Sequence, residues 1–84
     1  MKFADIGGGN IAAASRVLAV ASADSAPIRR MMQEARDRAM LVDCCAGKKC
    51  RSVLIMDSDH IVTSALEVAA VRKNMEDNVW QKDY

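Results

Sequence analysis

The sequence is poor in aromatic residues, which occupy three of its 84 positions, and it has a single proline and a single histidine. With so few rings it lacks the platform on which modules for single-stranded DNA or RNA stack bases, which argues against these modules. No apolar stretch reaches the roughly 18 residues of a membrane span, and the first five residues lack the apolar segment of a signal peptide. Three cysteines, an odd number, fit a reducing compartment better than a disulfide framework. We therefore expect a cytoplasmic protein without a membrane partner.

Length and apolar content together predict one small domain that associates with copies of itself. A domain of this size buries only about 60–65% of the surface that its unfolded chain exposes, yet 51% of the residues are hydrophobic. This is more apolar material than one small core needs. We expect the surplus to be buried between copies in a closed, symmetric homo-oligomer. Residues 1–78 should form the domain, and residues 79–84 a flexible C-terminal tail.

Local patterns predict an α+β domain with a small antiparallel sheet and the element order ββαβββα. Strands are expected at residues 2–6, 11–21, 41–45, 51–56 and 60–65. A helix should begin after the N-cap Ser25, with Pro27 in its first turn and apolar side chains at helical spacing as far as Ala39. A second, weaker helix is expected at residues 67–78.

The net charge is only +1, but the charges are unevenly distributed. Residues 16–51 carry eight basic and four acidic side chains, which gives this segment a net charge of +4, and the remainder carries a net charge of −3. Such an asymmetry gives one face of a nearly neutral protein an attraction for a polyanion. Since no stacking platform is present, duplex DNA bound through its phosphates fits best.

Two groups of cations outside the helices are candidates for phosphate contact. Lys48, Lys49 and Arg51 lie within four residues, in a loop that opens a strand, and form a compact basic patch. Arg16 interrupts an apolar strand, where a charge is costly unless it reaches an edge, a neighbouring subunit or an external anion. The alternative for the loop is an exposed hairpin connection whose charges keep it soluble.

The first helix carries further candidate arginines. Arg30, Glu34 and Arg38 follow one another at i,i+4 spacing and could satisfy one another as a solvated ladder. Arg29 and Arg36 have no acid three or four residues away, so their guanidinium groups are free to fork onto phosphate. The alternative for this row is a solubilising surface.

Two motifs resemble binding sites without matching them. The glycines at residues 7–9 follow a strand, but the Gly-Lys-Ser/Thr of a nucleotide-binding phosphate loop does not follow them. Cys44, Cys45 and Cys50 do not have a zinc spacing, because adjacent strand residues point to opposite faces and no fourth ligand lies nearby. We expect these cysteines to be small buried hydrophobic residues, and no metal or cofactor is expected.

One cluster could carry catalysis. Asp57, Asp59 and His60 offer two carboxylates and an imidazole, as a metal-dependent hydrolase would need. The alternative is a tight hairpin turn, in which Asp and Ser bond to the local backbone. Because His60 would have to act without an evident nucleophile, we expect no catalytic residue, no small-molecule substrate and no enzyme.

An ordered set of short motifs resembles the RemA-like family of bacterial extracellular matrix regulators. The motifs are Ile6-Gly7-x-Gly9-Asn10-Ile11, Arg16, Ser25-Ala26-Pro27-Ile28, Arg36-Asp37-Arg38 and Met56-Asp57-Ser58-Asp59-His60. They fall within about residues 3–72, nearly the whole domain, and the ordered set with its spacing is more specific than any one motif.

The resemblance implies a DNA-binding transcription regulator that activates biofilm-matrix genes and forms a ring-shaped homo-oligomer, like small nucleoid-associated proteins. Family residues implicated in DNA binding match Arg16, Lys48 and Lys49, and a functionally sensitive proline matches Pro27. The family has an arginine pair where this chain has two lysines, which keep the charge but lose the planar fork that reads guanine. The three cysteines also depart from the family.

These observations predict a regulator that binds double-stranded DNA in the cytoplasm, at the nucleoid. The expected DNA contacts are Arg16, Lys48, Lys49 and Arg51, with Arg29, Arg30 and Arg36 as helpers. The alternative is a structural oligomer that binds no DNA and whose basic face meets an acidic protein.

Overall fold

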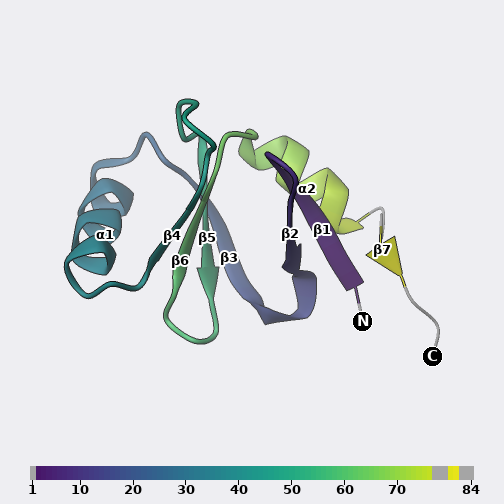
Figure 1. The fold of residues 1–84 in the computed structure, drawn as a ribbon, viewed down its shortest axis with the longest axis horizontal. Coiled ribbons are helices and arrows are strands. Elements are labelled where there is room, and N and C mark those ends of the chain that lie inside the picture. The colour runs from purple at the N-terminus through teal and green to yellow at the C-terminus, as the bar shows by residue number, and fades with distance from the viewer. Residues whose placement is uncertain (1, 77–79, 82–84) are drawn as a thin grey trace.

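The computed structural model describes residues 2–76 and 80–81, which form an α+β fold of two sheets and two α-helices (Figure 1). The strands are β1 (Lys2–Gly7), β2 (Asn10–Ala13), β3 (Val17–Ser22), β4 (Leu41–Cys44), β5 (Ser52–Met56), β6 (Ile61–Ser64) and β7 (Trp80–Gln81). The helices are α1 (Ala26–Asp37) and α2 (Val68–Glu76), and a short 3-10 helix, η1 (Ala14–Arg16), joins β2 to β3. Neither α-helix of the described residues is long and apolar enough to cross a membrane.

The strands form a small sheet, in the order β2-β1-β7, and a main sheet, in the order β3-β5-β6-β4. The α+β class is confirmed, but the main sheet is mixed rather than antiparallel, because β4 runs parallel to β6 with Leu41 opposite Ile61. The sequence suggested that β4 and β5 are joined as a hairpin. Instead, the connection between them crosses the end of β6, which separates the two strands.

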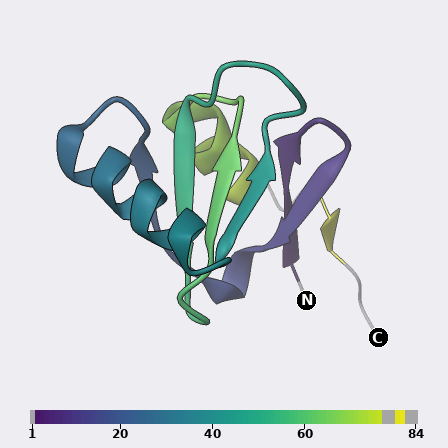
Figure 2. The same ribbon diagram turned by 60° about the vertical axis from the view of Figure 1, so that its left-hand side comes forward.

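The core lies in two layers, one on each face of the main sheet. Side chains of β5 alternate between the layers: Val53 and Ile55 pack with α1, whereas Leu54 and Met56 pack with α2 and the small sheet. Figure 2 shows α1 and α2 on opposite faces of this sheet. A strand that is buried on both faces reads as a continuous apolar run, which explains the sequence of β5.

The strand expected at residues 11–21 is wrong as a single element. It is divided by η1 into β2 and β3, which belong to different sheets. The segment is rich in alanine, which has little preference for strands, so tertiary packing decides its path. The break at Arg16 also removes the cost of a charge inside an apolar strand, because this side chain is exposed.

Helix α1 begins as the sequence predicts, since Ser25 Oγ accepts a hydrogen bond from the Ile28 N–H at 3.2 Å. It ends at Asp37, so Ala39, which was expected on the apolar stripe, lies beyond the helix with a φ of 59° and is exposed. Helix α2 covers residues 68–76 of the expected 67–78, and residues 77–78 lie outside the described ones. The sequence did not predict β7, and the rest of the expected tail, residues 79 and 82–84, also lies outside them.

A buried hydroxyl links the main sheet to the small sheet, and its removal is expected to destabilise the fold. Ser64 Oγ donates to the Ile6 carbonyl at 2.6 Å and accepts from the Leu66 N–H at 3.0 Å. Ser64→Ala leaves both backbone groups without this partner, so we expect urea denaturation to show a loss of about 1–3 kcal/mol in the free energy of unfolding. Ser58→Ala, at an exposed turn, should change it by less than about 0.5 kcal/mol. Equal losses in the two variants would contradict this role.

Candidate nucleic-acid interface

Arg16 and the cations of residues 48–51 lie at opposite ends of the main sheet, and the other predicted contacts lie on α1. Arg51 directly precedes β5, and Asp57, which pairs with Arg16, directly follows it. The six residue steps from Arg51 to Asp57 span about 20 Å in an extended strand. The loop between β4 and β5 therefore lies at the top of Figure 1, and η1 and the β5–β6 turn lie at the bottom. One protomer does not gather all of the predicted contacts on one end.

Residues 45–51, named here the basic loop, expose two lysines at the upper end. A tight turn begins the loop, because the Lys48 N–H donates to the Cys45 carbonyl at 3.0 Å and Ala46 and Gly47 have positive φ angles. Lys48 and Lys49 are exposed, and neither pairs with an acidic side chain among residues 2–76. Their ammonium groups are thus available to an external anion.

A hollow of about 320 Å³ lies beside the basic loop and brings charges of both signs together. Lys49 and Arg51 line it from the loop, with Asp24 and Glu67 from neighbouring segments. Arg51 Nη1 lies 3.3 Å from Glu67 Oε1, and Arg29 Nη2 lies 3.9 Å from Asp24 Oδ1. Both carboxylates lie next to arginines, whereas Lys48 and Lys49 have no acidic partner among residues 2–76.

The arginines of α1 do not pair as their spacing predicts. No ion pair joins Arg30, Glu34 and Arg38 among the described residues, so the ladder that their spacing allows is not formed. Arg29, expected to be unpaired, has instead the loose contact with Asp24, five residues before it. Arg30 and Arg36 are exposed on the helix, and Arg38, which directly follows it, is also exposed. An exposed ion pair gains little energy and restricts two long side chains, so within the described part of the chain these arginines remain unpaired on the solvated face of the helix.

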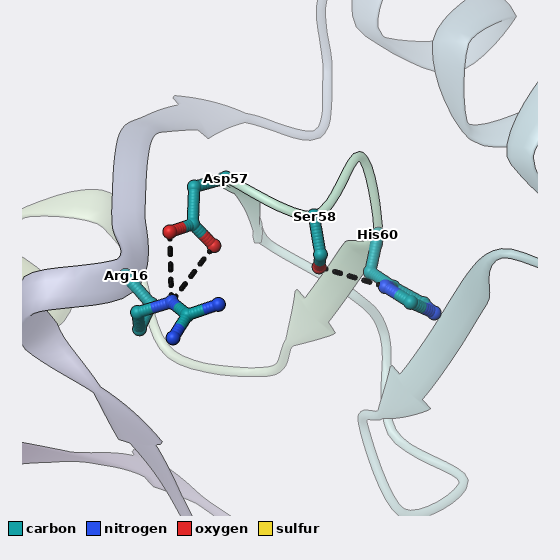
Figure 3. A network of polar contacts seen from close by, with 4 residues as sticks. All are labelled: Arg16, Asp57, Ser58 and His60. Atoms are coloured by element: carbon teal, nitrogen blue, oxygen red, sulfur yellow. Dashed lines mark hydrogen bonds and ion pairs between the residues drawn. The ribbon is translucent and has the colours of Figure 1, made fainter.

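Arg16 is held by Asp57 at the opposite end of the main sheet. Arg16 Nε lies 2.7 Å from Asp57 Oδ2 and 3.0 Å from Oδ1, and the Asp57 N–H donates to the Arg16 carbonyl at 2.9 Å. Figure 3 shows the terminal guanidinium nitrogens pointing away from this carboxylate. The side chain remains 63% exposed. Its pairing fixes the guanidinium group while the terminal nitrogens stay open to solvent.

The residues of the alternative hydrolase site do not converge. Asp57 pairs with Arg16, whereas His60 Nδ1 lies 2.8 Å from Ser58 Oγ within the turn (Figure 3). Asp59 has a φ of 71° and its N–H donates to the Met56 carbonyl at 3.1 Å. This is the hairpin turn that the sequence offered as the other interpretation, and it joins β5 to β6.

The cysteines differ from the sequence-based expectation. Cys45 and Cys50 form a disulfide across the basic loop, with their Cα atoms 5.5 Å apart, so they are not simply small buried hydrophobic residues. Cys44 does pack against the core between the two sheets, and burial, followed by the charge of Asp43, raises the pKa of its thiol. The five-residue separation and the turn residue Gly47 were the signals available in the sequence.

Asp43 anchors the start of the basic loop. Its Oδ1 accepts hydrogen bonds from the Cys45 N–H at 2.9 Å and from Thr63 Oγ1 at 3.0 Å. These two bonds, in that order, hold the pKa of Asp43 below its usual value of 3.8. The carboxylate therefore stabilises the fold above that pH, and this contribution is lost as the pH falls through the lower folded-state pKa.

Comparison with known proteins gives a consistent match over nearly the whole chain. The family model described as extracellular matrix regulatory protein A-like matches residues 3–75. A protein of Carboxydothermus hydrogenoformans is 48% identical over 80 residues, which cover 93% of this chain and 92% of that protein. Proteins of Heliobacterium modesticaldum and Bacillus pumilus are each 47% identical, covering 99% and 89% of this chain and 93% and 84% of their own. All three carry the name "Putative regulatory protein".

Proposed function

Because the chain belongs to the RemA-like family of extracellular matrix regulatory protein A-like proteins, we propose that it is a transcriptional regulator that binds duplex DNA as a ring-shaped homo-oligomer. The observation that carries this proposal is the pair of exposed lysines in the basic loop, which have no acidic partner among residues 2–76. A regulatory role rather than catalysis also agrees with the names of the relatives and with the alternative hydrolase site, whose side chains do not converge.

Lys48 and Lys49 are suited to phosphate rather than to base edges. An ammonium group is a compact point charge, whereas planar, bidentate recognition of guanine needs an arginine fork. Binding of this kind depends on the phosphate backbone, so it should show a weak sequence preference and a steep dependence on salt. Differences between sequences would then come mainly from how easily the DNA bends.

The exposed apolar residues favour association through the two edges of the main sheet. Leu18, on edge strand β3, is 70% exposed, and Val42, on the opposite edge strand β4, is 45% exposed. A hollow of about 350 Å³ lies beside β3, lined in part by Leu18, Val68 and Met75. Because the exposed apolar residues lie on two different edge strands, they favour head-to-tail contacts between chains. Such contacts close into a ring when the rotation between neighbouring chains allows it.

A ring also explains how so few cations per chain could bind DNA. One basic loop offers about two to three phosphate contacts, which is weak binding alone. A ring repeats the loop around its rim, so that each further contact becomes intramolecular and the total affinity rises steeply.

Competition distinguishes DNA from an acidic protein partner. A gel shift on a duplex of about 150 base pairs, near the DNA persistence length, is challenged with unlabelled duplex of unrelated sequence or with polyglutamate of equal total charge. We expect the duplex to compete and polyglutamate to compete poorly, because DNA has the higher charge density, one charge per about 1.7 Å. If polyglutamate displaces the protein as well as DNA does, an acidic protein becomes the better partner.

Variants of the Arg16–Asp57 pair test whether Arg16 contacts DNA or only stabilises the fold. Both side chains are more than a third exposed, so losing the pair should cost at most about 1 kcal/mol. If the terminal nitrogens bind phosphate, Arg16→Ala lowers the DNA affinity about threefold or more, whereas Asp57→Ala preserves or raises it. Fluorescence polarisation with a labelled duplex measures both variants. Equal losses in the two would assign Arg16 a structural role alone.

A further inference from the structure

The basic loop contains the one disulfide of the described residues, and this bond encloses both exposed lysines. Cys45 and Cys50 lie on either side of residues 46–49, which include Lys48 and Lys49. We propose that Cys45 and Cys50 form a reversible redox site that controls the order of the basic loop and, through it, the affinity for DNA. The control of the loop stands by itself, and its effect on DNA rests on the proposed function.

The two cysteines are held differently by the fold. Cys45 is 2% exposed, its N–H donates to Asp43 Oδ1 at 2.9 Å, and its Sγ lies 3.3 Å from Thr63 Oγ1. Cys50 is only half-buried, and its Sγ lies 3.9 Å from Asp43 Oδ1. Cys45 is therefore a fixed anchor on the main sheet, whereas Cys50 is the half that solvent and small oxidants can reach.

Few other interactions order the second half of the loop. The Lys48 N–H donates to the Cys45 carbonyl, and the next loop backbone N–H with a partner is that of Arg51, which donates to the Ser64 carbonyl at 2.8 Å. Gly47 has a φ of 79° and can adopt many conformations. When the disulfide is reduced, the loop loses the cross-link between Cys50 and Cys45, so Lys48 and Lys49 can adopt more positions.

Formation of the disulfide needs a two-electron oxidant, such as hydrogen peroxide or a low-molecular-weight disulfide. Oxidation joins the two sulfurs and releases two protons and two electrons, which convert hydrogen peroxide to two molecules of water. A low-molecular-weight disulfide serves as well and leaves as two thiols. In the reducing compartment that the cysteine count predicts, a disulfide is usually transient and redox-sensing rather than structural. The pair would then be reduced at rest and form its bond under oxidative conditions.

The closed loop is the state expected to bind DNA more tightly. Binding to phosphates costs conformational entropy, because the long lysine side chains and the loop become ordered. A loop closed by the disulfide has lost part of this entropy before it binds, so its binding costs less. We expect oxidation to raise the DNA affinity about 3- to 10-fold. It should also slow tryptic cleavage after Lys48 and Lys49, because a protease needs a flexible substrate.

The experiment compares oxidised and reduced full-length protein. Oxidised glutathione or dithiothreitol sets the state, which intact mass reports as a difference of two hydrogens. Wild type, Cys50→Ser and the control Cys44→Ala are then measured for tryptic cleavage of the loop and for DNA affinity. In wild type and in Cys44→Ala, we expect the oxidised form to resist cleavage and to bind DNA more tightly. Cys50→Ser should behave as reduced protein under both conditions.

Three results would overturn the proposal in separable ways. Failure of the Cys45–Cys50 bond to form in oxidised glutathione would remove the redox site. Equal cleavage rates in the two states of wild type would remove its control of the loop. Equal DNA affinities, with different cleavage rates, would remove only the coupling to DNA. If wild type binds DNA in neither state, the proposed function fails, and the redox site is judged on the mass and cleavage data alone.

Discussion

Replacing both Lys48 and Lys49 with alanine is expected to lower the affinity for duplex DNA about 100-fold or more at moderate salt. The two side chains are exposed and have no acidic partner among residues 2–76, so they are the cations most available to phosphate. If three neighbouring protomers meet the duplex, the double variant removes about six phosphate contacts. The slope of the logarithm of affinity against the logarithm of salt concentration should then fall by about five.

The control for this variant removes the same charge elsewhere. Lys2→Ala/Lys73→Ala takes two exposed lysines from β1 and α2, away from the basic loop. We expect this variant to keep most of the DNA affinity, while light scattering shows the same assembly for both double variants. If the two double variants lose affinity equally, net charge rather than the basic loop determines binding.

Leu18→Glu is expected to dissociate the oligomer into monomers that remain folded. Burying a leucine of this exposure stabilises an interface by about 1.5–3 kcal/mol, and a buried, unpaired carboxylate adds a further cost. Because a ring repeats the contact at every subunit, light scattering should detect the loss at micromolar protein. DNA affinity should fall with it, since the contacts are no longer linked.

Mixing two variants tests the head-to-tail arrangement specifically. Leu18→Glu disrupts the apolar surface of the β3 edge and leaves the β4 edge intact. Val42→Glu disrupts the β4 edge and leaves the β3 edge intact. Each variant alone should be monomeric, but an equimolar mixture should form dimers through the one intact pair of edges. Ile11→Glu, which removes an exposed apolar residue of the small sheet, should leave the ring intact. A ring that survives Leu18→Glu, or a mixture that stays monomeric, would contradict this interface.

The elements predicted correctly are those whose signals are local. The N-cap Ser25 and the apolar spacing that follows determine where α1 begins, and the Asp57–Asp59 turn determines the β5–β6 hairpin. Both depend on residues within a few positions of one another, so the sequence carries the whole signal. The same holds for the position of the basic loop, whose three cations lie within four residues of the chain.

The features that the sequence did not predict depend on distant residues. Arg16 and Asp57 are 41 positions apart, and their pairing accompanies the break between β2 and β3. The parallel pairing of β4 with β6 joins residues about 20 positions apart, and a four-residue strand does not encode which strand will lie beside it. Arg16 is separated from the basic loop by the length of β5, because the loop directly precedes this strand and Asp57, the partner of Arg16, directly follows it.

The cysteines show how a correct local rule can lead to an incomplete expectation. Adjacent strand residues point to opposite faces, and Cys44 does pack on a different side from Cys45. The loop that follows β4 then turns back, so Cys50 meets Cys45 within a closed segment. The rule describes strands, and both cysteines of the bond lie outside them, in the loop between β4 and β5.

The most direct test of the proposed function is the salt dependence of DNA binding by the wild-type protein, with its assembly followed in parallel by light scattering. We predict that the oligomer persists from about 50 to 200 mM salt while its affinity for duplex DNA falls about 1000-fold or more, as expected for six or more phosphate contacts. An oligomer that binds no duplex at low salt, or whose affinity is unchanged across this range, would contradict phosphate binding by the ring.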